Sequence, residues 1–171
     1  MFSIIAQAVG FIGTGVVILS YQCKSTRRMI FVLAVSALLF AIHYYMLGGL
    51  GGALSQILYA VNMFLLNDRK HAISSWIGWR WTITAILIVM TVMTWAGLPS
   101  LLPCLSSIAN THANWSRSGK IIRLNRLLFA SPCWILYDII MGSVSGIICE
   151  AFAMSSILIS IMRYGIMALD V

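Results

Sequence analysis

The positively charged residues of this chain alternate with its hydrophobic stretches in a pattern that constrains the fold to a membrane topology. All eleven lysines and arginines lie in the gaps that follow the first, third, fifth and seventh hydrophobic stretches, and the N-terminus and the other gaps carry none. They are Lys24, Arg27, Arg28, Arg69, Lys70, Arg80, Arg117, Lys120, Arg123, Arg126 and Arg163. Because positively charged loops stay on the cytoplasmic side, the pattern predicts seven transmembrane helices with the N-terminus outside the cell and the C-terminus inside.

Composition supports an all-α membrane protein. Hydrophobic residues make up 61% of the chain and charged residues 9%, which is far from the usage of soluble domains. Seven helices of roughly 17 to 21 residues would use most of the chain, so we expect one transmembrane domain over residues 1–171. The net charge of +7 lies on loops that would meet anionic lipid. Membrane lipid is therefore the expected partner, and nucleic acid is not.

The sequence predicts no metal site, cofactor or catalytic centre. The four cysteines are Cys23, Cys104, Cys133 and Cys149. Their spacing does not match a metal site, so we expect free thiols. The few acidic and histidine residues within the predicted helices have unrelated spacings and form no pattern of nucleophile and base. We therefore expect a protein that is not an enzyme.

An internal repeat emerges when the chain is compared with itself at a step of 94 residues. This step places the Gly-x-x-x-Gly turn that starts at Gly48 on the one that starts at Gly142, and it places Gln56 on Glu150. Chance similarity between apolar helices is the alternative explanation. The matching turns and polar positions favour duplication.

Two three-helix units joined by a single linker helix have the same orientation in the membrane. We expect the first repeat at about residues 2–70, the linker helix at about 73–97 and the second repeat at about 98–164. Parallel repeats place a solute site near the membrane midplane, at the interface between them. This organisation predicts a transporter or facilitator of a small polar solute. The alternative is a membrane partner or regulatory protein whose polar residues only hold helices together.

Two segments resemble motifs of the SWEET sugar carriers. Residues 134–138 are similar to the Trp-x-x-Tyr-Gly segment of that family, and Glu150 follows Tyr137 by thirteen residues, where those carriers place a binding asparagine. Residues 40–44 and Gln56 take the same places in the first half. The resemblance implies two parallel three-helix bundles with Trp134 and Tyr137 near the solute. The Pro-Gln signature after the first helix is absent, so the resemblance does not extend to sugar as the solute.

A second resemblance covers nearly the whole chain. Residues 42–48 and 53–62 are similar to the His-aromatic-aromatic-Leu-Gly turn and third helix of the YgjV family of small bacterial inner-membrane proteins. Residues 101–103, 133–135 and 142–150 extend the resemblance through the second half. It implies a multi-pass protein of the bacterial inner membrane, for which the charge pattern predicts a periplasmic N-terminus and a cytoplasmic C-terminus. It implies no activity.

Glu150 is the most distinctive polar residue within an apolar helix. It lies roughly 10 Å past the turn at Gly142, well inside a hydrocarbon layer about 30 Å thick. Desolvation there favours the neutral acid unless a cation or donor compensates. Glu150 is therefore either a proton-coupled or solute-binding residue, or a protonated glutamate hydrogen-bonded between helices.

Three more polar residues have a structural and a functional interpretation. Asp138 lies within about one turn of the outer boundary, where it is either solvated or lines a vestibule. His43 is either a proton-sensitive gate or a buried histidine hydrogen-bonded to a neighbouring helix. Gln56 either completes a two-sided polar site with Glu150 or joins helices by hydrogen bonds.

Polar residues on the fifth predicted helix recur at steps of three and four residues and so share one face. They are Ser106 or Ser107, Asn110, Asn114 and Arg117. Such a stripe is typical of a cavity wall, although tight helix packing would also satisfy it. Asn62 on the third helix is expected to face it. The predicted solute-binding residues are Glu150, Gln56, Asn62, Asn110, Asn114, Trp134, Tyr137, His43 and Asp138.

Overall fold

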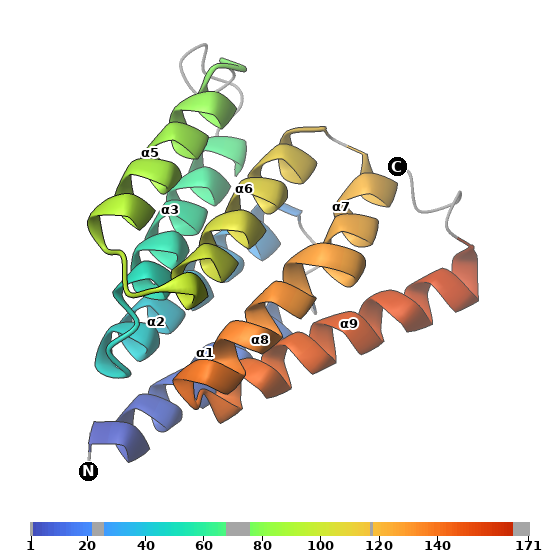
Figure 1. Cartoon of the computed structure of the whole chain (residues 1–171). Coiled ribbons are helices and arrows are strands. Elements are labelled where there is room, and N and C mark those ends of the chain that lie inside the picture. Colours follow the sequence, from blue (N-terminus) through green and yellow to red (C-terminus); the bar gives the residue numbers. More distant parts are fainter. Residues whose placement is uncertain (1, 22–25, 68–75, 117, 166–171) are drawn as a thin grey trace.

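The computed structural model describes residues 2–21, 26–67, 76–116 and 118–165, and within these ranges every regular element is helical (Figure 1). The elements are α1 (Phe2–Tyr21), α2 (Thr26–Met46), α3 (Leu50–Asn67), α5 (Trp79–Met93), the 3-10 turn η1 (Leu98–Ser100), α6 (Leu101–Ser116), α7 (Gly119–Asn125), the π-helical turn η2 (Arg126–Ala130), α8 (Ser131–Met141) and α9 (Val144–Tyr164). The predicted all-α class is confirmed. Of the basic residues and cysteines named above, Cys23, Lys24, Arg69, Lys70 and Arg117 lie outside the described residues.

The described residues form seven helices of 15 residues or more, as predicted, because α7, η2 and α8 form one continuous helix over Gly119–Met141. This helix, α3 and α9 are long and apolar enough to cross a membrane. Helices α1, α2 and α5 contribute shorter apolar segments, at Ile4–Ser20, Ile30–Met46 and Trp79–Met93. Helix α6 carries the polar stripe. The chain is thus a helical protein with membrane-spanning helices.

Large apolar side chains are exposed on each of these helices. Ile4, Met93, Leu128 and Met162 are each at least 70% exposed, although they come from four different helices. So many exposed large apolar side chains are unfavourable in water and are expected against lipid. Trp76 is also exposed, in the turn before α5 begins. Residues 73–75, the first part of the predicted interfacial segment and linker, lie outside the described residues.

The two predicted glycine turns end their helices in the same way. Gly48 and Gly142 both have a positive φ, 82° and 65°, which is the left-handed conformation that glycine adopts most easily. In each turn the next N–H donates to a carbonyl five residues earlier, from Gly49 to Tyr44 and from Ser143 to Asp138, at 2.8 Å in both. The turns therefore fold α2 back onto α3 and α8 back onto α9.

The first three helices pack against the last helices mainly where α1 meets α9 and where α3 meets α6. Helix α1 packs on α2 and α9, while α3 packs on α2, α5 and α6, and α6 in turn packs on α8. Buried apolar residues fill the space between α1–α3 and α6–α9. They are Val17, Phe40, Tyr44, Ala53, Trp134, Tyr137 and Cys149. The main core thus lies between the N-terminal and C-terminal helices.

The orientation of the chain in the membrane stays a prediction from its charges. A fluorescent protein fused after Val171 is expected to fluoresce, because that end is predicted to be cytoplasmic. Alkaline phosphatase, which folds only outside the cytoplasm, is expected to be inactive there and active when inserted after Gly48. The reverse pattern at the two positions would contradict the predicted topology.

Candidate functional site

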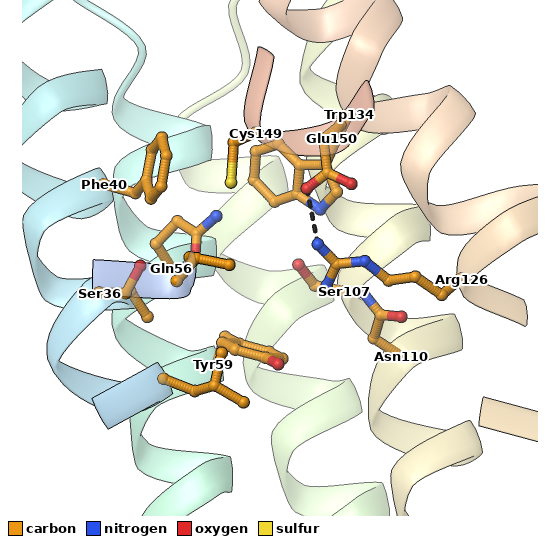
Figure 2. A pocket seen from close by; sticks show the side chains of 13 residues that line it. Ser36, Phe40, Gln56, Tyr59, Ser107, Asn110, Arg126, Trp134, Cys149 and Glu150 are labelled. Carbon is orange, nitrogen blue, oxygen red and sulfur yellow. Dashed lines mark hydrogen bonds and ion pairs between the residues drawn. The ribbon is translucent and has the colours of Figure 1, made fainter. Parts of the chain in front are cut away.

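A cavity of about 80 Å³ lies between the N-terminal and C-terminal helices (Figure 2). Each of the long helices except α5 contributes to its wall. Its lining residues are Val17, Leu33, Ser36, Ala37, Phe40, Gln56, Tyr59, Ser107, Asn110, Arg126, Trp134, Cys149 and Glu150. Since a water molecule takes about 30 Å³ of liquid volume, the cavity holds a few water-sized groups.

Glu150 lies in the cavity wall as half of an ion pair. Its Oε1 is 2.8 Å from Nη2 of Arg126, and its Oε2 accepts a hydrogen bond of 2.5 Å from Ser131 Oγ. Only 9% of the residue is exposed. The guanidinium supplies the cation that a carboxylate at this depth requires. Glu150 is therefore hydrogen-bonded to a neighbouring helix, as its structural interpretation expected, and it is also paired with a basic side chain.

Arg126 is the site residue that the sequence analysis missed, because it was counted among the basic residues of a cytoplasmic stretch. It begins the π-helical turn η2, in which the Ser131 N–H donates to the Arg126 carbonyl. Turns of this kind shift the register of a helix and are frequent at functional sites. The missed signal was the acid itself, since a buried Glu150 requires a cation and Arg126 is the basic residue that reaches furthest into an apolar segment.

Gln56 and Glu150, which the 94-residue step matches, both line this cavity although they come from α3 and α9. Figure 2 shows Gln56 and Ser36 on one side of the cavity and the Arg126–Glu150 pair on the other. Both walls are thus polar.

The polar stripe of α6 reaches the cavity only in part. Ser107 and Asn110 line it, and Asn110 Oδ1 accepts a hydrogen bond of 2.9 Å from Asn125 Nδ2. Ser106 donates instead to the Ala130 carbonyl at 3.1 Å. Asn114 is absent from the described lining, because it lies one helical turn beyond Asn110.

Asn62 is also not brought to the cavity. It is fully buried, and its Oδ1 accepts a hydrogen bond of 2.8 Å from the Trp115 indole N–H. At 3.6 residues per turn, the step from Gln56 to Asn62 turns the side chain onto a different face of α3. Asn62 therefore joins α3 to α6.

The two aromatic candidates on α8 have different surroundings. Trp134 lines the cavity and stacks on Tyr44, with ring centroids 5.4 Å apart. Tyr137 is outside the described lining, and its hydroxyl oxygen accepts a hydrogen bond of 3.2 Å from the Gly52 N–H. Trp134 therefore forms part of the cavity wall, while Tyr137 packs against the beginning of α3.

Asp138 contradicts both expectations, since it is neither solvated nor in the wall of a vestibule. It is fully buried, and Tyr44 donates a hydrogen bond of 2.7 Å to its Oδ1. The carboxylate lies over Gly146, where a Cβ atom would overlap it. The residue is near a helix end, but it faces α2 and α9 rather than the outside.

His43 is the buried histidine bonded to a neighbouring helix that the sequence analysis allowed. It is fully buried, its Nδ1–H donates to the Ala6 carbonyl at 2.7 Å, and its Nε2 lies 2.8 Å from Ser143 Oγ. Ser143 also accepts from the Gly146 N–H and so caps α9. His43 therefore connects α1, α2 and the beginning of α9.

Hydrogen bonds between the N-terminal and C-terminal helices gather at the end of the molecule that carries the glycine turns. We call them the turn-end hydrogen bonds: His43–Ser143, Tyr44–Asp138, Gly52–Tyr137 and Gln7–Gly142. Gln7 Nε2 donates to the Gly142 carbonyl at 2.6 Å. Together these bonds close the molecule on one side of the cavity.

The bond between Tyr44 and Asp138 is expected to contribute measurably to stability. The Tyr44→Phe substitution removes the donor and leaves a buried carboxylate oxygen without it, which should lower the free energy of unfolding by about 1 to 3 kcal/mol. Thermal unfolding of the purified protein in detergent would measure the change. Tyr45→Phe is the matched control because Tyr45 is 66% exposed. Equal effects of the two substitutions would contradict the assignment.

Comparison with known proteins identifies the family of the chain. The model of the family Imp-YgjV, described as a bacterial inner membrane protein, matches residues 4–168. The chain is also similar to the inner membrane protein YgjV of Escherichia coli (strain K12), with 26% identity over 150 residues that cover 85% of this chain and 76% of that protein. No solved structure matches the chain. Since the family match spans nearly every residue, the chain belongs to the YgjV family of bacterial inner membrane proteins.

Proposed function

We propose that this protein binds a small polar solute in the cavity and moves it across the inner membrane. In this proposal α1–α3 and α6–α9 act as two parallel three-helix bundles of the SWEET type, and α5 links them. The main support for this proposal is the cavity between these helices. One of its walls contains Gln56 and the other contains the Arg126–Glu150 pair. A carrier of this kind catalyses no reaction.

The charged pair supports a binding role over a purely structural one. Burying a carboxylate and a guanidinium requires removal of their hydration shells, and apolar side chains of similar size often stabilise a fold as well or better. In a membrane protein, buried ionisable groups beside a water-sized cavity typically mark a solute or ion path. Glu150 meets both conditions, since it is buried and lines the cavity, and the partly buried Arg126 lines the cavity beside it.

Three features are those expected of two bundles related by a twofold axis along the membrane normal. The 94-residue step exchanges α1 with α6 and α3 with α9, and the contact of α1 with α9 has its counterpart in the contact of α3 with α6. The step also relates the identical hydrogen bonds in the two glycine turns. Finally, Tyr44 and Asp138 are 94 residues apart and bond to each other, as equivalent positions next to such an axis do. A solute site between parallel repeats follows from this symmetry.

The turn-end hydrogen bonds supply a barrier of the kind that a carrier opens and closes. These four bonds join the two groups of helices on one side of the cavity, while the Asn62–Trp115 bond joins α3 to α6 on the other side. Alternating access by rocking of one bundle against the other would break the turn-end hydrogen bonds and expose the cavity on their side.

Thiol labelling tests this proposal. Single cysteines are introduced as Gln56→Cys and Asn110→Cys in a protein whose four native cysteines are replaced, because Cys149 itself lines the cavity. A water-soluble thiol reagent is expected to label both positions, and a transported solute is expected to protect them. Asn114→Cys is the control, since this residue lies one turn outside the cavity and should not be protected. Unreactive thiols at both cavity positions would instead favour a membrane partner or regulatory protein.

A further inference from the structure

We infer that the solute class is a small zwitterion, with one carboxylate and one ammonium group. This inference rests on the proposed function and names the chemistry of the same site. It comes from the two opposite charges in one wall of the cavity, where Arg126 Nη2 and Glu150 Oε1 lie 2.8 Å apart.

The charge of the lining selects against solutes of one sign. Among the described residues that line the cavity, Arg126 and Glu150 are the side chains with a full charge, so their sum is zero. An anion that binds the guanidinium by displacing Glu150 leaves a largely buried carboxylate without its ion pair, and a cation at Glu150 takes from Arg126 the carboxylate that it contacts in the cavity wall. Breaking a buried pair in this way is strongly unfavourable.

A zwitterion avoids this loss because it replaces the internal pair with two new pairs. Its carboxylate binds the guanidinium of Arg126. The guanidinium is planar and has several N–H donors, which match the two oxygens of a carboxylate. Its ammonium group binds Glu150 Oε1, while Ser131 continues to donate to Oε2. The exchange ends with more ion pairs than it began with.

The surrounding polar groups suit both ends of such a molecule. Gln56 faces the pair across the cavity and has an amide with both donors and an acceptor (Figure 2). Ser107 and Asn110 add hydroxyl and amide groups to the wall from α6. The volume of about 80 Å³ suits a small solute of a few heavy atoms.

Four solutes of nearly equal size and different charge test the inference. Glycine is the zwitterion, glycolate the anion, glycinamide the cation and glycolamide the neutral molecule. At about pH 6.5 the α-amino groups are protonated. The readouts are thermal stabilisation of the full-length protein in detergent and protection of Asn110→Cys from labelling. Glycine is expected to act at concentrations at least tenfold lower than the other three.

Charge substitutions should change the preference in a defined direction. Glu150→Gln keeps the guanidinium and is expected to favour glycolate, whereas Arg126→Gln keeps the carboxylate and is expected to favour glycinamide. The double substitution Arg126→Gln/Glu150→Gln has no net change in charge and is expected to favour glycolamide. It also keeps two hydrogen-bonding side chains, so it provides a test if either single variant fails to fold.

The outcomes separate this inference from the proposed function. If glycolamide protects the wild-type cavity as well as glycine does, or if the substitutions leave the preference unchanged, the zwitterion inference is wrong while solute binding stands. Accessible thiols that none of the four solutes protects also overturn the inference. Cavity thiols that remain unreactive under all conditions overturn the proposed function itself.

Discussion

Glutamine in place of Glu150 is expected to lower the free energy of unfolding by about 2 to 3 kcal/mol, and Arg126→Gln by a similar amount. Each substitution removes the ion pair between Arg126 and Glu150 while the opposite charge stays in the cavity wall. The expected loss is below the range of about 3 to 5 kcal/mol typical of fully buried pairs, because the Arg126 side chain is 25% exposed. The double substitution removes both charges together. It should therefore cost much less than the sum of the single substitutions.

A double-mutant cycle measures this coupling directly. Unfolding of the wild type, both single variants and the double variant in the same detergent should yield an interaction energy of about 1 to 3 kcal/mol. Arg28→Gln is a suitable control because Arg28 is an exposed basic residue on α2. Additive single effects would show that the two side chains do not act as a pair and would remove the charge argument for the cavity.

The Gly52→Ala substitution is expected to destabilise the protein by about 2 kcal/mol, because it introduces a methyl group into a filled space. A Cβ atom on Gly52 would lie 2.6 Å from Cε1 of Tyr137 and 2.8 Å from its hydroxyl oxygen. The ring is held by Tyr44 and Trp134, whose ring centroids are 5.6 Å and 5.8 Å away. It cannot withdraw without disturbing the core between the helices.

Gly15→Ala is the matched control, since it makes the same change within a helix where no atom lies within 4 Å of the added methyl group. Alanine has the higher helix propensity, so this substitution should stabilise the protein by about 0.5 to 1 kcal/mol. Thermal unfolding in detergent should show a lower stability than wild type for Gly52→Ala and a higher stability for Gly15→Ala. If Gly52→Ala is neutral or stabilising, the close approach of α3 and α8 at Tyr137 is incorrect.

The elements of the fold could be read from local signals. Long apolar stretches predicted the helices, and the glycines at Gly48 and Gly142 predicted the turns, which the structure confirms with positive φ angles. Such features depend on residues close together in the chain, because helix formation and turn conformation are local properties.

The candidate site was predicted less completely. Gln56, Asn110, Trp134 and Glu150 reach the cavity, whereas Asn62, Asn114, Tyr137, His43 and Asp138 do not line it. The position of a residue along a helix predicts its depth but not the face on which it lies. Helices that are apolar all round carry no amphipathic pattern that would reveal this face. Asp138 illustrates the problem, since its depth suggested solvent while its face is covered by Tyr44.

The sequence by itself determined that this chain forms apolar helices separated by glycine turns and basic loops, since charge, hydropathy and glycine act through short stretches of chain. Only the tertiary structure decided that Arg126 meets Glu150 and that Asp138 is buried beneath Tyr44. These contacts join residues on different helices. They depend on the rotation of each helix about its axis, which is set by packing against its neighbours and not by its own residues.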